Sequence, residues 1–235
     1  MRARAWFNRV HFWLSAIVGV QILIWIGTGL FFAANPIDQV RGAHLRKDPP
    51  LAAIAWDRVK TPPEIAAAAV DASSVDIQLR MIDGAPTYLV RALNGRSALV
   101  DAETGAVRPV IDAVTAARIV ATTYTGAGQS TAPIWLTAKT GEYRGPVPAW
   151  RVDFTGPDAA ALYVDAATGE VKAVRTPLWR LYDALWGLHI MDWRERENFN
   201  SMLLIFAASL ASMLAFVGLG LTACRLARAV KRRAA

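Results

Sequence analysis

The sequence predicts an α+β domain, built from helices and antiparallel sheets, that two transmembrane α-helices anchor to a membrane. Residues 10–37 and 199–224 contain no Lys, Arg, Asp or Glu, and these two uncharged runs predict the anchors. Between them, stretches of alternating polar and apolar residues follow short segments with helix-capping signals. Alternation with period two is typical of half-buried antiparallel strands, so the domain is expected to pack its sheets against its helices.

The two uncharged runs are long enough to cross a bilayer. Each exceeds the ~20 residues that an α-helix needs to span a hydrocarbon core of about 30 Å. Lipid offers the backbone no hydrogen-bond partner, so both runs are expected to be helical. A cleavable signal peptide is the alternative for the first run, but its apolar core is typically about 7–15 residues long. We therefore predict membrane helices at 10–34 and 199–224.

The basic residues predict the orientation of the chain. The tails at 1–9 and 225–235 hold eight basic residues and no acid, whereas the region between the anchors is nearly neutral. Lys and Arg are retained on the cytoplasmic side, so both termini are expected there and the central domain outside. A nearly neutral domain also argues against nucleic-acid binding, which needs clustered basic residues. The single cysteine, Cys224, allows no internal disulfide.

The central domain contains an internal repeat. Asp-Ala-Glu-Thr-Gly-Ala-Val at 101–107 recurs as Asp-Ala-Ala-Thr-Gly-Glu-Val at 165–171. Gly105 and Gly169 are expected to supply the positive φ that a tight hairpin needs. The acidic residues at these turns are interpreted as turn formers, because the ligand-rich loop of a calcium site is missing.

A helix is predicted ahead of each set of strands. Thr61 and Glu64 have the spacing of a capping box, with prolines between them in the first turn. Asp112 is expected to cap a second helix over residues 113–122. The sequence therefore predicts two modules, at 59–110 and 111–175, each with one helix followed by three or four antiparallel strands.

Small residues in the anchors favour close helix packing. Ser15, Gly19 and Gly27 share one face of the first helix, and alanines repeat every four residues over 207–215 in the second. Such spacing lets helices approach closely in lipid. It fits either pairing of the two helices within one chain or a four-helix bundle in a homodimer.

The three histidines are candidate ligands. His11 lies at the cytoplasmic edge of the first anchor, either as a haem ligand or as part of an interfacial aromatic belt. His44 and His189 are expected outside, at the two junctions between the domain and its anchors. Two imidazoles there could share a metal ion or haem iron, with Asp192 orienting the His189 ring. The alternative is two structural histidines bonded to backbone carbonyls.

The two segments that join the central domain to its anchors are predicted to differ. Residues 35–58 are expected to be a linker. Residues 176–198 are predicted to lie on the outer leaflet as an amphipathic segment, because an aromatic stripe recurs there at spacings of three and four. The same stripe would form a flat wall for a porphyrin. Its members are Trp179, Tyr182, Trp186, His189 and Trp193.

These features together resemble a known family. The helix, the strands and the Thr-Gly endings are similar to PepSY modules. Val-His-Phe-Trp-Leu at 10–14, Val-Arg-Gly-Ala-His-Leu at 40–45 and Leu-His-Ile-Met-Asp-Trp at 188–193 are similar to PepSY-associated transmembrane proteins. Relatives often carry Arg where this chain has Phe12, and an acid is expected where it has Ala43. The resemblance implies tandem periplasmic PepSY modules on a bacterial inner-membrane protein.

The resemblance implies two alternative functions. Some larger relatives are haem-containing reductases for siderophore-bound iron, which implies an accessory protein that supports metal uptake or reduction. Haem b would then be bound by His11, His44 and His189. The alternative is a non-enzymatic periplasmic module that binds and modulates a protease or another envelope partner. The residues themselves offer no phosphate-binding glycine loop, nucleophile elbow or His-Glu-x-x-His motif, so hydrolysis and phosphoryl transfer are unsupported.

Overall fold

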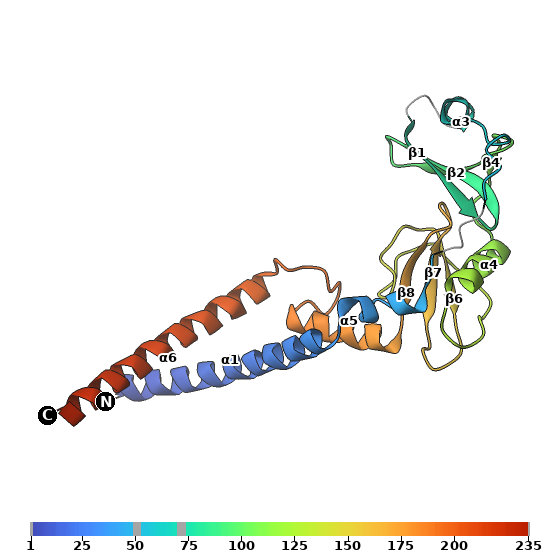
Figure 1. The fold of residues 1–235 in the computed structure, drawn as a ribbon. Helices are drawn as coiled ribbons and strands as arrows, with labels where there is room; N and C mark the ends of the chain where they lie inside the picture. Colours follow the sequence, from blue (N-terminus) through green and yellow to red (C-terminus); the bar gives the residue numbers. More distant parts are fainter. Residues whose placement is uncertain (1, 49–52, 70–73, 235) are drawn as a thin grey trace. The chain divides into compact units, whose positions relative to one another are not determined.

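A computed structural model describes residues 2–48, 53–69 and 74–234 (Figure 1). These residues fall into two compact units: residues 1–36 together with 181–235, and residues 37–180. The helices are α1 (Arg2–Ala34), α2 (Ile37–Val40), η1 (Ala43–Leu45, a 3-10 helix), α3 (Pro62–Ala69), α4 (Ala113–Thr123), α5 (Pro177–His189) and α6 (Met202–Ala234). The strands are β1 (Ser74–Ile82), β2 (Ala85–Ala92), β3 (Ser97–Asp101), β4 (Val107–Arg108), β5 (Ile134–Leu136), β6 (Ala149–Asp153), β7 (Ala161–Asp165) and β8 (Val171–Arg175).

The two long helices of the first unit extend beyond the predicted anchors. Helix α1 begins at Arg2, so residues expected to form a tail are helical. Helix α6 begins at Met202, later than predicted, and continues through the basic residues to Ala234. Apolar composition marks the length that crosses lipid, but a helix continues until a capping or helix-breaking residue ends it. Helix α1 ends at Ala34 as predicted, but the apolar runs did not predict where α1 begins or where α6 begins and ends.

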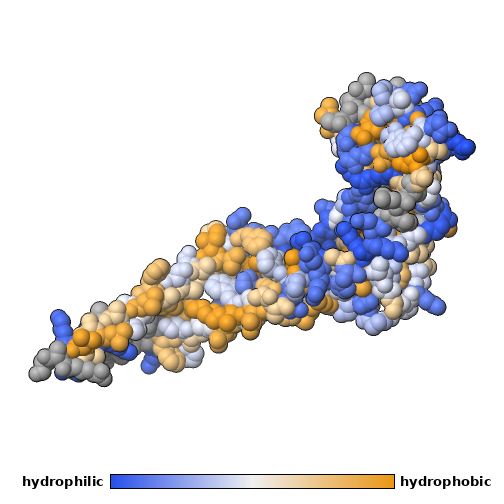
Figure 2. Space-filling view, in the orientation of Figure 1, coloured by the Kyte–Doolittle hydropathy of each residue, from blue (hydrophilic) through white to orange (hydrophobic). Residues whose placement is uncertain are grey.

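The apolar parts of α1 and α6 remain candidates for membrane spans. Phe12–Ala34 and Met202–Arg232 are long and apolar enough by length and composition. Apolar residues run along both helices in Figure 2, and large side chains such as Leu30 and Phe216 are 70% and 74% exposed. A methyl group added at Gly19 or Gly27 would meet no atom within 4 Å. The predicted small-residue face of α1 is therefore not in tight contact with α6 at these two glycines.

The second unit contains two four-stranded antiparallel sheets. Their strand orders are β1-β2-β3-β4 and β5-β6-β7-β8. Glu64 reaches back to Thr61 as the predicted capping box requires, because the Thr61 amide and hydroxyl both donate to Glu64 Oε2 at 2.7 Å. Asp112 Oδ1 accepts a hydrogen bond from the Thr115 amide at 2.7 Å and caps α4. These contacts confirm both predicted helix starts.

Strand β2 is buried on both faces of the first sheet. On one face Tyr88 and Val90 pack against Ile65 of α3. On the other face Leu89 belongs to a cluster that includes residues of both predicted modules. This cluster, called here the shared core, comprises Ile82, Leu89, Leu99, Ile111 and Ala116, with Ile119 and Trp150 packed against it. The two predicted modules therefore share a hydrophobic core.

The second sheet is also covered on both faces. Val120 of α4 packs with Leu162 and Val164 on one face, and Tyr143 stacks on Tyr163 on the other. Residues 35–58, expected to be a linker, contribute to this packing. Leu45 of η1 belongs to the same cluster as Val120, and α2 and η1 give this segment helical structure of its own.

Candidate functional site

His189, at the last position of α5, is held against α1 within the first unit. Thr28 Oγ1 lies 2.7 Å from His189 Nδ1, and Trp25 Nε1 donates to the His189 carbonyl at 2.8 Å. Thr28 is buried, with 5% of its surface exposed. The imidazole is therefore fixed by hydrogen bonds to both its ring and its backbone.

The Thr28 hydroxyl indicates which ring nitrogen of His189 carries hydrogen. The hydroxyl lies 2.7 Å from the Ile24 carbonyl, which can only accept. Because a hydroxyl has one hydrogen, donation to Ile24 leaves Oγ1 to accept from His189 Nδ1–H. The lone pair of the neutral ring then lies on Nε2, the nitrogen that commonly binds metal. Burial lowers the pKa of His189 below its ordinary value of 6.5, which favours this neutral form.

Aromatic side chains surround the His189 ring. Its centroid lies 5.4 Å from that of Phe32, and the ring of Trp186 is parallel to it within 8°. Phe32 also packs against Tyr182 at 4.6 Å. Trp193, predicted to continue the stripe, lies beyond the end of α5 and is 58% exposed. The stripe on α5 is therefore shorter than predicted.

Asp192 does not have the predicted role toward His189. The helix ends at His189, and Asp192 instead accepts hydrogen bonds from the backbone amides of residues 194, 195, 197 and 198. These four bonds lower the pKa of its carboxyl group, with the Asn198 amide the largest cause. The group that holds the His189 ring is Thr28, a residue that the sequence reasoning missed. Thr28 lies 161 residues from His189 along the chain, so no local sequence pattern indicated this contact.

The other two histidines have different surroundings. His44 is exposed in η1 of the second unit, and its carbonyl accepts from Thr125 Oγ1 at 2.9 Å. His189 belongs to the first unit and His44 to the second. The side chain of His11 lies outside the described part of the structure. Among the side chains that the structure describes, which exclude those of His11 and Cys224, no three His, Cys, Asp or Glu form a group that could hold a metal ion.

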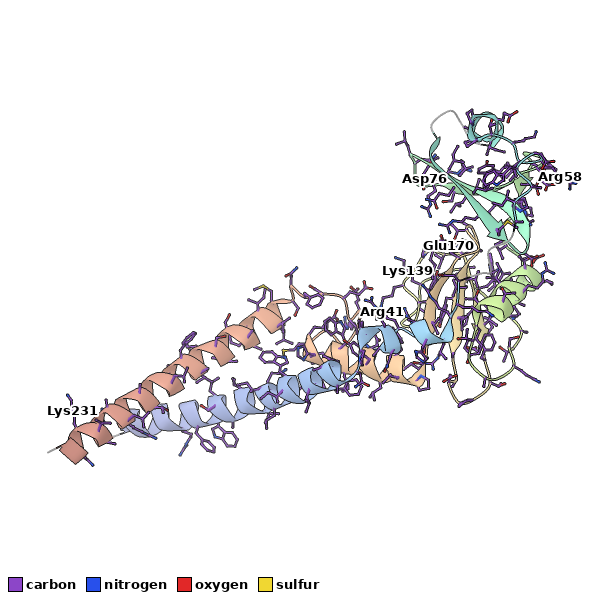
Figure 3. All side chains as sticks on the ribbon, viewed as in Figure 1. Arg41, Arg58, Asp76, Lys139, Glu170 and Lys231 are labelled. Carbon is purple, nitrogen blue, oxygen red and sulfur yellow. The ribbon has the colours of Figure 1, made fainter. Side chains whose placement is uncertain are left out.

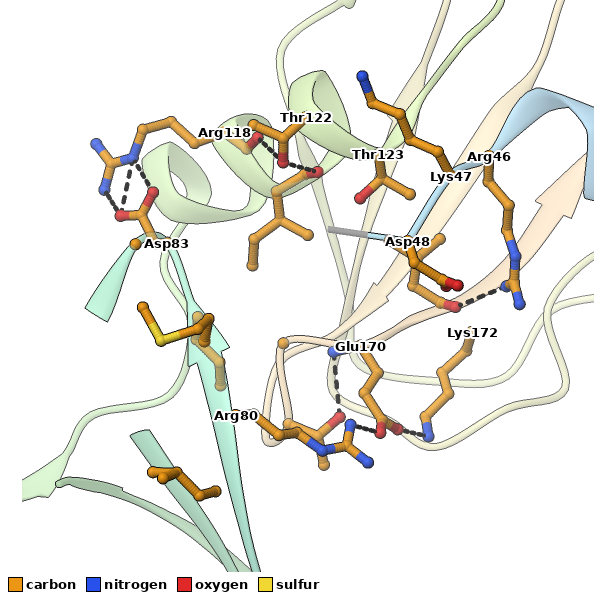
Figure 4. Close-up of a pocket in the computed structure, with 18 of the residues that line it drawn as sticks. Arg46, Lys47, Asp48, Arg80, Asp83, Arg118, Thr122, Thr123, Glu170 and Lys172 are labelled. Carbon is orange, nitrogen blue, oxygen red and sulfur yellow. Dashed lines mark hydrogen bonds and ion pairs between the residues drawn. The ribbon is translucent and has the colours of Figure 1, made fainter. Parts of the chain in front are cut away.

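A second candidate site is a cleft of about 970 Å³ within the second unit (Figure 4). The hairpin of β1 and β2 lines one side through residues 79–84, and helix α4 lines another through residues 118–123. The turn between β7 and β8, residues 168–172, the segment 46–48 and Ile54 complete the described lining. The cleft was not predicted from the sequence, because its parts come from segments far apart in the chain.

Charged side chains dominate the rim of the cleft. Glu170 forms ion pairs with Arg80 of β1 and Lys172 of β8, and Figure 4 shows the two cations on either side of it. Arg118 Nε donates to Asp83 Oδ1 at 2.8 Å. Arg46 Nη1 donates to the Val171 carbonyl at 3.3 Å. The cleft therefore combines an apolar lining with charged side chains that hydrogen bonds and ion pairs hold in place.

Comparison with known proteins identifies one domain in the second unit. A family model described as "Peptidase propeptide and YPEB domain", abbreviated PepSY, matches residues 111–175. This range contains α4 and the sheet from β5 to β8, and it coincides with the second predicted module. No curated protein and no solved structure matches the chain. The chain is therefore a PepSY domain-containing protein.

Proposed function

We propose that this protein is a two-pass inner-membrane accessory protein that displays its PepSY domain in the periplasm and acts by docking an envelope partner. The observation that carries the proposal is the presence of a PepSY domain and two long apolar helices in one chain. The domain's description relates it to peptidase propeptides, which favours modulation of a protease. PepSY domains are typically extracellular or periplasmic, and the basic tails support a cytoplasmic position for both termini.

The second unit supports docking through its strand edges. Strands β1, β4, β5 and β8 stand at the ends of the two sheets. An edge strand presents unpaired amides and carbonyls to which an extended segment of a partner can add. On β5, Ile134 and Trp135 are 50% and 40% exposed. Such side chains would give an added strand apolar contacts as well as hydrogen bonds.

Single cysteines labelled in intact cells test both parts of this proposal. In a Cys224→Ser background the chain has no other cysteine, so Asn94→Cys, Lys139→Cys, Lys172→Cys and Lys231→Cys each give one reactive site (Lys139 and Lys231 are labelled in Figure 3). A membrane-impermeant maleimide carrying a photo-crosslinker should label the first three positions. Irradiation should then join at least one of them to a discrete envelope protein. Lys231→Cys should react only after the cells are permeabilised.

The two parts of the proposal fail separately in this experiment. Labelling of Lys231→Cys, but not of the other three, would show the opposite orientation. Labelling of all three outer positions with no protein adduct at any of them would contradict docking while leaving the orientation intact.

A second candidate function is ligation of haem by His189, favoured by the geometry of its ring. Thr28 holds Nδ1, and no described residue forms a hydrogen bond with Nε2, so a neutral imidazole donor is available. The donor therefore fits an axial ligand of haem iron. When bound, haem would supply an iron centre that changes oxidation state. The residues of this chain would hold its ligand and exclude water with Phe32 and Trp186. In this version the protein supports uptake or reduction of a metal complex.

Absorbance spectroscopy tests the haem proposal. Protein purified in detergent after expression with ample haem is expected to show a Soret band, and His189→Ala should abolish it. Thr28→Val should retain haem but shift the Soret band, because His189 Nδ1 loses its hydrogen bond to the Thr28 hydroxyl. Trp193→Ala, a change at an exposed aromatic residue beyond α5, is the control and should leave the spectrum unchanged. Wild-type protein without bound haem, or His189→Ala with a full Soret band, would contradict His189 ligation.

A further inference from the structure

We propose that the cleft of the second unit binds an extended peptide segment with acidic side chains, which adds as a strand to the outer edge of β1. This inference rests on the proposed docking function and names its site and the chemistry of the partner. The cleft's volume of about 970 Å³ is at the upper end of the range of ligand pockets, about 300–1,000 Å³. The edges of two different sheets line it, and each is a place where a peptide backbone can pair.

Strand β1 is the better edge for an added strand. It stands at the end of the first sheet and contributes four consecutive residues, 79–82, to the lining. Strand β8 contributes only residues 171 and 172, and the carbonyl of Val171 already accepts from Arg46. A peptide on β1 would therefore have the longer run of backbone with which to pair, at about 3.4 Å per residue.

The side chains of the cleft favour a peptide in which acidic and apolar residues alternate. Five cationic and three acidic side chains occur in the described lining, an excess of two positive charges. The apolar lining includes Leu79, Met81 and Ile119. Because successive side chains of a strand point to opposite faces, an alternating peptide can place its apolar side chains on one face and its carboxylates on the other.

Two cations of the cleft, Arg46 and Lys47, form none of the described ion pairs and are available to such carboxylates. Arg80 and Lys172 share Glu170, and Arg118 pairs with Asp83. Arg46 is exposed and makes its described hydrogen bond to a neutral carbonyl. Lys47 is exposed, and its ammonium has no partner among the residues that the structure describes. A carboxylate that reaches either residue gains a charge-assisted hydrogen bond without breaking an existing ion pair.

Binding of defined peptides to the full-length protein in detergent tests the proposal. The probe is fluorescein-labelled Thr-Glu-Val-Glu-Val-Glu-Thr, followed by fluorescence anisotropy. Its Kd should be at least about tenfold lower than that of the same peptide with Lys in place of Glu. N-methylation of alternate backbone amides should abolish binding, because a methylated amide cannot donate to the β1 edge. Raising the salt concentration should weaken the binding of the Glu peptide.

Charge reversal locates the site. Lys47→Glu and Arg46→Glu are each expected to raise the Kd of the acidic peptide about tenfold. Lys139→Glu is the matched control, because Lys139 is exposed in the same unit but does not line the cleft. It should leave the Kd unchanged. Circular dichroism of each variant is the check that it is folded, and Lys47→Glu disturbs no described side-chain contact.

Three results would overturn the inference: equal affinity for the Glu and Lys peptides, tolerance of N-methylation, or an equal loss of affinity in Lys139→Glu. The charges would then act only to protect the strand edge from aggregation. Photo-crosslinking to an envelope protein without peptide binding would remove this inference and leave the docking function. Peptide binding at the cleft without any cellular crosslink would support the site and contradict the docking function in cells.

Discussion

Leu89→Ala is expected to destabilise both halves of the second unit by about 2–5 kcal/mol, the usual cost of truncating a fully buried leucine. Leu89 has no exposed surface. It lies on β2, outside the PepSY match, yet it shares a core with Ile111, Ala116 and the partly buried Trp150 inside that match. The cavity would therefore remove contacts from α4 and from both sheets. We expect one cooperative unfolding transition at a lower denaturant concentration.

Hydrogen exchange gives the decisive measurement for Leu89→Ala. Amides of β2, β3, α4 and β6 should lose protection together in the variant. Leu93→Ala is the matched control, because Leu93 is 76% exposed in the turn after the same strand, and its truncation should cost less than about 0.5 kcal/mol. If β2 and β3 lost protection while α4 and β6 kept theirs, the two predicted modules would fold independently and the shared core would contribute little.

Gly128→Ala is expected to destabilise the second unit by at least about 2 kcal/mol, within the range for backbone strain. Gly128 has φ of 120°, a conformation that residues with a side chain rarely adopt. An added Cβ would lie 1.4 Å from the Thr155 carbonyl oxygen. The neighbouring backbone is held in place, because the Thr155 amide donates to the Gln129 carbonyl at 2.9 Å. The clash is with backbone and must move the loop.

Chemical unfolding of Gly128→Ala, compared with Gly141→Ala, isolates this strain. A Cβ at Gly141 would meet no atom within 4 Å, and Gly141 has no positive φ. The same substitution there should leave the unfolding midpoint near that of the wild type. Coincident midpoints for the two variants would show that the loop at 128 and 155 adjusts without cost.

Local features were predicted well from the sequence because neighbouring residues determine them. The capping contacts of Thr61 and Asp112 involve partners three residues away. Gly105 and Gly169 have φ of 77° and 69°, as the predicted hairpin turns require. The PepSY match at 111–175 has the same bounds as the second predicted module. The other site predictions, ligation by His11, His44 and His189, remain predictions.

Features that depend on distant residues were not predicted. Thr28 and His189 are 161 residues apart in sequence, and their hydrogen bond replaces the expected contact with Asp192. Arg80 and Glu170 are 90 residues apart and form an ion pair at the rim of the cleft. Single-sequence patterns report which residues share a face of one element. Such patterns do not show which face of another element those residues contact.

The sequence alone determined the apolar helices, the helix caps, the Thr-Gly turns and the alternation that produces the strands, because each arises from composition or from contacts within a few residues. The tertiary structure decided that the two sheets share a core, that Thr28 orients His189 and that charged edges of separate sheets line one cleft. The physical reason is that burial and charge pairing depend on which surfaces meet, and those surfaces come from segments far apart in the chain.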